Sequence, residues 1–277
     1  MKLCVIGGAG ARSAFLTKSL VKSTRDIRVD HIVLLDNDQQ KLKTYGEISR
    51  ELSRRLDPDL TFEVTSDARA ALTGVDYIIT TIRAGGDAGR LFDEQTCLAH
   101  GVLGQETTGA GGFAMAIRSV PTLVYYCTLA REVANPGHLI FNFTNPSGII
   151  TQALRSKGFD NVYGICDAPS GFIKQLEEIL EIPYGTLDIE CYGLNHLSWF
   201  RNAKVNGRDV QRELLDNPRT YEHSEMRLFT REMARISGDC MLNEYLYFYY
   251  RRVKSLSMIQ KADHPRGEMI YLINREL

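Results

Sequence analysis

Short apolar runs alternate with amphipathic segments along the first part of the chain. Runs rich in aliphatic and β-branched residues predict strands, whereas the segments between them carry apolar residues at helical spacing. The predicted strands are Lys2–Ile6, His31–Asp36, Leu60–Thr65, Asp76–Ile82, His138–Thr144 and Val162–Ile165. About six alternations of strand and helix predict an α/β fold with a doubly wound, Rossmann-type parallel sheet.

The pattern changes after Ser170, where paired strands and several helices follow one another. Residues 187–192 and 199–205 are predicted strands, and Asn206-Gly207 has the composition of a hairpin turn. Helices are expected at 171–180, 220–235, 242–254 and 269–277. We therefore predict a first domain over residues 1–168 and a second, mixed α+β domain over residues 169–277.

Composition and charge narrow the classes of function. The 277 residues include 33 Lys+Arg and 34 Asp+Glu, a balance that does not suggest binding to nucleic acid or to an anionic membrane. No run of ~20 apolar residues predicts a membrane span. The 6 cysteines are scattered without a CxxC pair, so we expect reduced thiols and a cytoplasmic protein.

The first predicted strand runs into a glycine-rich turn. Gly7, Gly8 and Gly10 lie between this strand and a predicted helix, in the pattern G-x-G-x-x-S that ends at Ser13. Such glycines let the backbone approach a pyrophosphate, although one motif of this kind is weak evidence. Asp36 ends the second strand and is suited to accept hydrogen bonds from ribose hydroxyls, which favours NAD over NADP. The alternative is that Asp36 caps the helix predicted over residues 39–55, and both roles can coexist.

Two more glycine-rich segments follow later strands. Arg83-Ala-Gly-Gly-Asp-Ala-Gly-Arg90 is predicted to be a loop flanked by arginines, which suits an anionic ligand. The alternative is ordinary solvated surface charge. Gly104-Gln-Glu-Thr-Thr-Gly-Ala-Gly-Gly112 is a second predicted loop and holds the acid Glu106.

A thiol and an imidazole supply the strongest hint of metal chemistry. Cys166 and Asp167 follow the sixth predicted strand, at the sheet edge where ligands of open α/β sheets bind. His196 lies further along, among apolar neighbours. A thiolate and an imidazole are plausible ligands of one divalent metal ion. Two ligands alone are too few to specify a metal, so these residues by themselves favour an inert cysteine and a hydrogen-bonded core histidine.

Several motifs, in order, resemble those of glycoside hydrolase family 4, the NAD- and divalent-metal-dependent glycosidases. Besides the first glycine turn and the segment 104–112, the motifs are Asn142-Phe-Thr-Asn-Pro-Ser-Gly148, Cys166-Asp-Ala-Pro169, Gly193-Leu-Asn-His-Leu-Ser-Trp199, Tyr245-Leu-Tyr-Phe-Tyr249 and Arg266-Gly-Glu268. The resemblance covers essentially the whole chain, and it implies an NAD-binding domain over residues 1–168 and a catalytic, substrate-binding domain over residues 169–277. It implies hydrolysis of a 6-phospho-glucoside, with the phospho-β-glucosidase branch the more similar.

The resemblance also implies a mechanism without the usual pair of carboxylates. The carbon-3 hydroxyl of the sugar is oxidised with NAD, a base removes the carbon-2 proton, and the glycosidic bond breaks by elimination. Water then adds and the hydride returns to carbon 3. By resemblance, Cys166 and His196 are the ligands of a divalent ion such as Mn²⁺, Tyr245 is the carbon-2 base and Asp167 is the acid that assists the leaving group. For Tyr245 the alternative is aromatic core packing.

The family motifs also imply substrate contacts. Asn145, Arg90 and Arg266 match residues near the sugar, and Arg266 is the candidate for binding its 6-phosphate, so the expected partner is a phosphorylated disaccharide or glucoside. Asp167 departs from the Asn that is common among phospho-β-glucosidases, which leaves the anomer open. The chain is shorter than family members, so we expect an incomplete second domain. We also expect a homo-oligomer, either a dimer or a tetramer.

Two other functions remain open at this stage. A 2-hydroxy-acid dehydrogenase would share the nucleotide-binding domain, but it has no need of the Cys166 and His196 pair or of Tyr245. A shortened, inactive remnant that binds NAD would also carry the same motifs.

Overall fold

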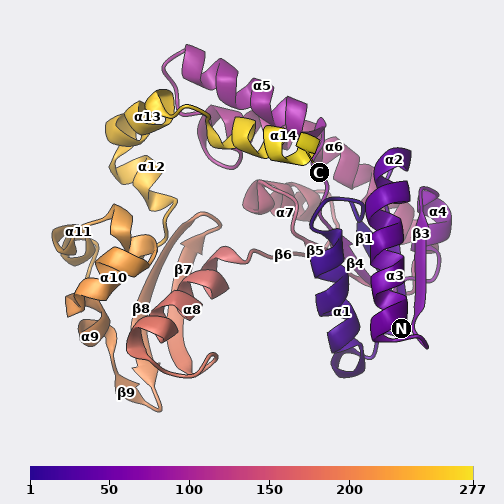
Figure 1. Cartoon of the computed structure of the whole chain (residues 1–277), viewed down its shortest axis with the longest axis horizontal. Helices are drawn as coiled ribbons and strands as arrows, with labels where there is room; N and C mark the ends of the chain where they lie inside the picture. Colours follow the sequence, from indigo (N-terminus) through magenta and orange to yellow (C-terminus); the bar gives the residue numbers. More distant parts are fainter. Residues whose placement is uncertain (277) are drawn as a thin grey trace. The chain divides into compact units, whose positions relative to one another are not determined.

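The computed structural model describes residues 1–276, which form two compact units (Figure 1). Unit 1 comprises Met1–Thr96, Gly104–Ile165 and His264–Leu277, and unit 2 comprises Cys97–Leu103 and Cys166–Asp263. The chain thus enters unit 2 briefly at Cys97–Leu103, enters it again at Cys166 and returns to unit 1 at His264. The functional division predicted at residue 168 remains a prediction.

Unit 1 is built on a six-stranded, wholly parallel sheet with strand order β3-β2-β1-β4-β5-β6. This is the order of a doubly wound dinucleotide-binding sheet, and it confirms the predicted fold class. The strands are β1 (Lys2–Ile6), β2 (His31–Leu35), β3 (Thr61–Thr65), β4 (Tyr77–Thr80), β5 (Leu139–Asn142) and β6 (Val162–Gly164). The helices are α1 (Ser13–Ile27), α2 (Gln39–Lys41), the π-helix η1 (Leu42–Gly46), α3 (Glu47–Leu56), α4 (Ala68–Leu72), α5 (Gly86–Ala99), α6 (Gly109–Val133), α7 (Ser147–Ser156) and α14 (Arg266–Glu276).

Alternate residues of β1 enter separate cores on the two faces of the sheet. Leu3 and Val5 pack with Val21 of α1, whereas Cys4 and Ile6 pack with residues of α6 and α7. Because successive side chains of a strand point to opposite faces, a strand buried on both faces needs apolar residues at every position. The continuous apolar runs of the sequence reflect this double burial.

Helix α6 differs from the sequence-based expectation in where it starts. It begins at Gly109, inside the predicted second loop, and it contains Pro121. Among residues 1–276 it is also the one helix long and apolar enough to cross a membrane. Leu123 and Cys127 of α6 are buried in the core on one face of the sheet, and this packing accounts for part of its apolar composition.

Unit 2 combines an antiparallel sheet with short helices. The strands are β7 (Leu187–Leu194), β8 (Leu197–Val205), β9 (Arg208–Asp209) and β10 (Met241–Leu242), in the order β10-β8-β7 with β9 paired to β8. The helices are α8 (Ala168–Leu180), α9 (Gln211–Asp216), α10 (Pro218–His223), the 3-10 helix η2 (Glu225–Leu228), α11 (Arg231–Ile236), α12 (Leu246–Tyr250) and α13 (Arg252–Lys261). The predicted hairpin turn at Asn206-Gly207 is confirmed, and both residues have positive φ.

The core of unit 2 lies between α8 and β8. Phe172 and Phe200 meet edge to face with ring centroids 4.9 Å apart, and both are fully buried. The predicted helix over 220–235 is wrong in detail, because Ser224 and Thr230 each accept a backbone hydrogen bond as helix caps and divide the segment. The side chains of such residues compete with a continuous helix.

Candidate metal and dinucleotide sites

The structure brings Cys166 and His196 together within unit 2. Cys166 directly precedes Asp167, the residue at the start of α8, and His196 lies in the two-residue turn between β7 and β8. The Cys166 Sγ and His196 Nε2 atoms are 3.5 Å apart. The side chain of His196 is buried, and its backbone has a φ of 59°. A buried histidine in this less common conformation is held there by its surroundings.

The β7–β8 turn depends on a glycine two residues before Asn195. Gly193 has a φ of 117°, and a Cβ atom there would lie 2.3 Å from the carbonyl oxygen of Leu197. Any other residue would therefore push the two strands apart. Gly193 lets them close tightly enough to place His196 facing Cys166.

Tyr245 stacks on the imidazole of His196. Their ring centroids are 3.7 Å apart and the ring planes differ by 3°. Tyr245 precedes α12, whereas Tyr247 on that helix is buried in the core beside Phe229. The two tyrosines thus have different surroundings. Tyr247 packs in the core, which was the alternative role considered for Tyr245, whereas Tyr245 lies beside the candidate metal ligands.

A small cavity of about 160 Å³ adjoins these residues. Besides His196 it is lined by Asn243, Ser198 and Tyr192, which sequence reasoning did not select. Asn243 could have been noticed, because it stands two residues before Tyr245 in the sequence. Asp167 is exposed, and its side chain forms no capping hydrogen bond with α8. An exposed carboxyl in this place remains accessible to a ligand.

The donor pair fits a divalent metal ion. With metal–sulfur and metal–nitrogen bonds of roughly 2.3 and 2.1 Å, two donors 3.5 Å apart would subtend an angle of ~105° at one ion, which is acceptable for tetrahedral or octahedral coordination. Among residues 1–276 no cluster of three or more His, Cys, Asp or Glu side chains could hold a metal. The chain therefore offers two ligands, and an ion bound there would keep open positions for other oxygens.

The glycine turn of unit 1 fits a dinucleotide. The N–H groups of Gly7 and Gly8 both donate to the carbonyl oxygen of Leu35, at 2.8 and 3.0 Å, which joins the turn to the end of β2. A Cβ on Gly7 would lie 2.8 Å from the backbone of Thr81, whereas a Cβ on Gly10 would meet no atom within 4 Å. Gly7 thus permits close packing, and the space beside Gly10 is open to a ligand.

The start of α1 also suits an anion. Its first turn contains no acidic residue, and Arg12 at the N-cap position forms no side-chain capping bond. The N–H groups at a helix start carry partial positive charge and attract phosphate.

Asp36 organises the same turn. Its carboxylate accepts the N–H of Ala9 at 3.1 Å and that of Asp38 at 3.1 Å. The following helix is capped by Asp38, which accepts from Gln40 and Lys41, so the suggested capping role of Asp36 is wrong. A carboxylate has about four acceptor positions, and Asp36 therefore retains capacity for ribose hydroxyls.

Arg90 is surrounded by protein carboxylates in unit 1. The predicted loop over 83–90 is wrong in its second half, because α5 begins at Gly86 and carries Arg90. The Nε atom of Arg90 donates to Glu94 at 2.8 Å, and Nη1 lies 3.1 Å from Glu106. Its side chain is 7% exposed, so Arg90 is not the solvated surface charge that was the alternative. Its predicted substrate contact remains a prediction.

Arg266, in contrast, is exposed at the start of α14 and forms no ion pair with the described residues. The next residue, Gly267, donates its N–H to Glu94 at 2.8 Å, which ties the helix start to α5. A Cβ on Gly267 would lie 2.5 Å from the same carboxylate. Asn145 is half-buried in the turn between β5 and α7.

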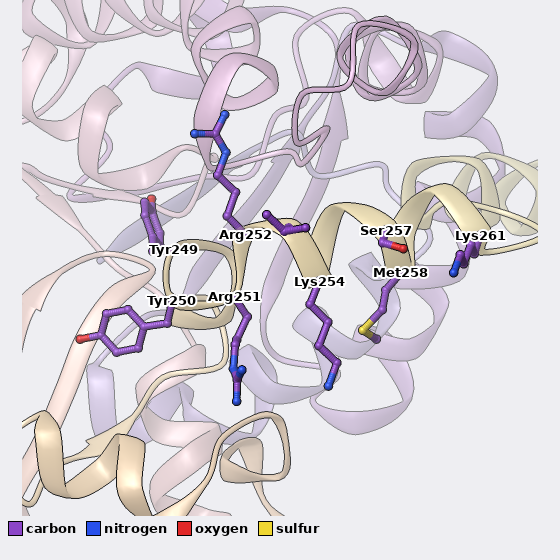
Figure 2. A pocket seen from close by; sticks show the side chains of 9 residues that line it. Tyr249, Tyr250, Arg251, Arg252, Lys254, Ser257, Met258 and Lys261 are labelled. Carbon is purple, nitrogen blue, oxygen red and sulfur yellow. The ribbon is translucent and has the colours of Figure 1, made fainter.

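The larger hollow of unit 2, about 780 Å³, lies along α12 and α13. Figure 2 shows the side chains of Arg251 and Arg252 extending to opposite sides of the chain, with Lys254 on the side of Arg251. Its basic groups therefore do not converge on one point. We assign no ligand to this hollow.

Comparison with known proteins decides the family. The model described as Family 4 glycosyl hydrolase matches residues 2–182, and that of the Family 4 glycosyl hydrolase C-terminal domain matches residues 191–277. The chain belongs to glycosyl hydrolase family 4. The resemblance found in the sequence motifs is thereby confirmed.

Relatives within family 4 include enzymes of both anomeric specificities. The 6-phospho-beta-glucosidase BglT of Thermotoga maritima is 31% identical over 100% of this chain and 66% of its own length. A structure of the Thermotoga maritima enzyme with manganese, NAD+ and glucose-6-phosphate matches with a TM-score of 0.89, 30% identity and coverage of 100% of this chain and 65% of that chain. A 6-phospho-alpha-glucosidase from gut microorganisms, in complex with NAD and Mn2+, matches with a TM-score of 0.89, 26% identity and coverage of 99% and 67%.

The chain thus spans about two thirds of the length of these family 4 relatives.

Proposed function

We propose that this chain is a family 4 glycosidase that hydrolyses 6-phospho-glucosides with NAD and a divalent ion, Mn²⁺ being the first candidate. The observation that carries the proposal is the arrangement of Cys166, His196 and Tyr245 in unit 2. A thiol and an imidazole 3.5 Å apart, with a phenol stacked on the imidazole, form an unusual set of neighbours. A nucleotide-binding fold alone does not require it.

Each residue has a chemical task in this proposal. Cys166 and His196 hold the ion and leave positions open for sugar oxygens. When bound, NAD takes up and returns a hydride at a sugar carbon, and the divalent ion neutralises negative charge on sugar oxygens. The Tyr245 hydroxyl, as phenolate, accepts the proton from carbon 2 of the sugar. Asp167 donates a proton to the departing glycosidic oxygen.

The glycine turn and Asp36 hold NAD in preference to NADP. Gly7, Gly8 and Gly10 let the pyrophosphate approach the start of α1, and Asp36 accepts from the ribose hydroxyls. A 2′-phosphate at that position would meet the negative carboxylate of Asp36. In this proposal unit 1 therefore binds the phosphates of the dinucleotide and also discriminates against a 2′-phosphate on its ribose.

Arg266 is the proposed phosphate-binding residue. Its guanidinium is exposed and free of carboxylates in the described residues, and it can hold a phosphate through two hydrogen bonds. Of the two candidate arginines, Arg90 already pairs with Glu94 and Glu106, so Arg266 is the one available for the phosphate. The expected partner is thus a phosphorylated disaccharide or glucoside.

We propose the β-glucoside as the preferred substrate, on the family motifs and the likeness to BglT. Asp167 favours the second candidate, a 6-phospho-α-glucosidase, because it departs from the Asn that the resemblance implies for phospho-β-glucosidases. Nitrophenyl 6-phospho-α- and β-glucosides distinguish the two directly. Faster turnover of the α-glucoside would replace our choice of anomer while leaving the metal and NAD assignments intact.

The test of the proposed function is hydrolysis of both glucosides with NAD and Mn²⁺ present, or with each omitted. We expect turnover only with both. Cys166→Ser and His196→Ala should each reduce turnover by a factor on the order of 10²–10³, because several kcal/mol of charge stabilisation is lost. The exposed His223 offers a matched control, since His223→Ala should retain full activity.

Two outcomes would contradict this proposal. Lasting NADH absorbance without a metal requirement would identify a dehydrogenase. No turnover of either glucoside, despite NAD binding, would identify a remnant.

A further inference from the structure

Glu225 is a buried carboxyl group in unit 2 that has no task in the proposed function. It begins the 3-10 helix η2 and is 6% exposed. Its Oε2 atom accepts two hydrogen bonds, from Asn243 Nδ2 at 3.2 Å and from the backbone N–H of Glu244 at 2.8 Å. Both donors lie in the short segment that leads to Tyr245.

Asn243 connects this carboxyl to the candidate site. It is 1% exposed, and its backbone N–H donates to the carbonyl oxygen of Ser198 at 3.2 Å. Its Oδ1 atom accepts the backbone N–H of Tyr245 at 3.1 Å. Asn243 also lines the cavity beside His196. One buried side chain therefore fixes both the wall of the cavity and the backbone of Tyr245.

A buried carboxylate is costly unless its surroundings compensate for lost hydration. The pKa of Glu225 is raised to about 7, chiefly by burial; the charge of the nearby Glu244 contributes to the rise, and the Glu244 N–H and Arg227 oppose it. Within residues 1–276 no cation lies within ion-pair distance of Glu225. The neighbouring α8 presents the neutral Gln175, which accepts the Glu225 N–H at 2.9 Å. The fold thus keeps a titratable group where an uncharged side chain would be easier to bury.

We propose that Glu225 is a positioning residue: its carboxylate orients Asn243 and, through Asn243, the backbone turn that presents Tyr245 to the substrate. This inference rests on the proposed function, in which Tyr245 removes the carbon-2 proton. Hydrogen bonds to an ionised acceptor are stronger than those to a neutral one. The hold on Tyr245 therefore tightens when Glu225 loses its proton, and turnover should rise as it ionises.

Two variants distinguish the effect of the hydrogen-bond acceptor at Glu225 from the effect of its negative charge. Glu225→Gln keeps an oxygen that accepts from Asn243 and Glu244 but does not ionise, whereas Glu225→Leu leaves both donors unpaired. The exposed Glu222 on α10 gives the matched control, Glu222→Gln. We expect Glu225→Leu to lower kcat about tenfold or more, with KM changed less than about twofold.

Glu225→Gln should recover most of the kcat lost in Glu225→Leu, and its pH–rate profile should lack the wild-type step near pH 7. NAD affinity and the melting temperature at pH 6 should stay close to wild type in Glu225→Gln. If Glu225→Leu has wild-type kcat, or if Glu225→Gln is as impaired as Glu225→Leu while keeping wild-type melting, the positioning role is wrong.

A measurement without turnover keeps this inference separate from the proposed function. In ¹H–¹⁵N NMR spectra the backbone amide of Tyr245 and the side-chain amide of Asn243 should titrate together, with a midpoint near that of Glu225. Both titrations should vanish in Glu225→Gln and persist in Glu222→Gln. Amides that do not respond to pH would overturn the inference even in an active enzyme. Amides that do respond in a protein with no glycosidase activity would support it and refute the proposed function instead.

Discussion

Glu94 in unit 1 and Glu225 in unit 2 are both buried, and each holds a backbone N–H next to a residue with a proposed function. Glu94 accepts from Gly267, which follows Arg266, and Glu225 accepts from Glu244, which precedes Tyr245. Their other partners differ. Glu94 is paired with the guanidinium of Arg90, whereas Glu225 accepts from the neutral amide of Asn243.

This difference in partners means that Glu94 holds its backbone segment rigidly, whereas the hold of Glu225 depends on pH. The guanidinium of Arg90 compensates the buried carboxylate of Glu94, and removing it leaves an uncompensated buried charge. A buried carboxyl group held only by neutral donors has a higher free-energy cost of ionisation, so its pKa lies closer to neutral pH. The start of α14 is thus fixed by an ion pair, while the turn at Tyr245 is held by a group that changes its charge.

The largest expected effect is the loss of stability when the buried ion pair of unit 1 is removed. Arg90→Ala should lower the free energy of unfolding by about 3–5 kcal/mol, because Glu94 and Glu106 lose their buried cation. Arg55→Ala is a matched control: Arg55 also pairs with a glutamate four residues away but is 73% exposed, and its loss should cost less than ~1 kcal/mol. Urea unfolding of both variants measures the difference. Equal, small losses would show that the Arg90 pairs do not stabilise the fold.

The next effect is a pH dependence in unit 2. The pKa of Glu225 is about 7 in the folded protein against an ordinary value of 4.5, so the folded state binds the proton more tightly. The resulting stability is fully present below about pH 4.5 and is lost as the pH rises through about 7. Relative to Glu225→Gln, wild type should lose on the order of 3 kcal/mol of unfolding free energy between pH 4.5 and 8.

Urea unfolding at several pH values checks this expectation, with Glu222→Gln as the control that should follow wild type. Parallel curves for wild type and Glu225→Gln would mean that the carboxyl is not perturbed by burial.

The smallest effect concerns Arg266, whose neighbour Gly267 is tied to Glu94. Arg266→Ala should raise KM for a 6-phospho-glucoside by about tenfold or more, since charge-assisted hydrogen bonds to the phosphate are lost. Unphosphorylated glucosides should be affected far less. Arg275→Ala, on the last turn of the same helix, should leave both unchanged. An equal loss on both substrates would make Arg266 a structural residue.

The sequence predicted the fold where the signal was local. The β-branched runs of β1, β2 and β4 and the glycine turn at Gly7 need no knowledge of distant contacts, and all were found as expected. The pair of Cys166 and His196 was suggested by the ligand chemistry of a thiol and an imidazole, and the family motifs then turned this suggestion into a prediction. Their 3.5 Å separation depends on the β7–β8 turn and the start of α8, which no short pattern encodes.

Tertiary partners explain what the sequence did not predict. The glycines around residue 86 suggested a loop, yet α5 begins there and Arg90 joins Glu94 on the same helix and Glu106 beyond it. Glu225 resembles any surface glutamate in the sequence. Its role depends on Asn243, 18 residues away along the chain, and only the folded structure brings the two together.

The fate of the proton on carbon 2 of the sugar tests the central claim most directly. If Tyr245 removes that proton before the glycosidic bond breaks, hydrolysis in heavy water must place deuterium at carbon 2 of the product. Tyr245→Phe should lose this turnover while still binding NAD and the metal ion, whereas Tyr249→Phe, at an exposed site, should retain it. Product that carries deuterium at carbon 2 is the result we predict. Product with hydrogen at carbon 2 would contradict the elimination mechanism, even if the sugar is hydrolysed.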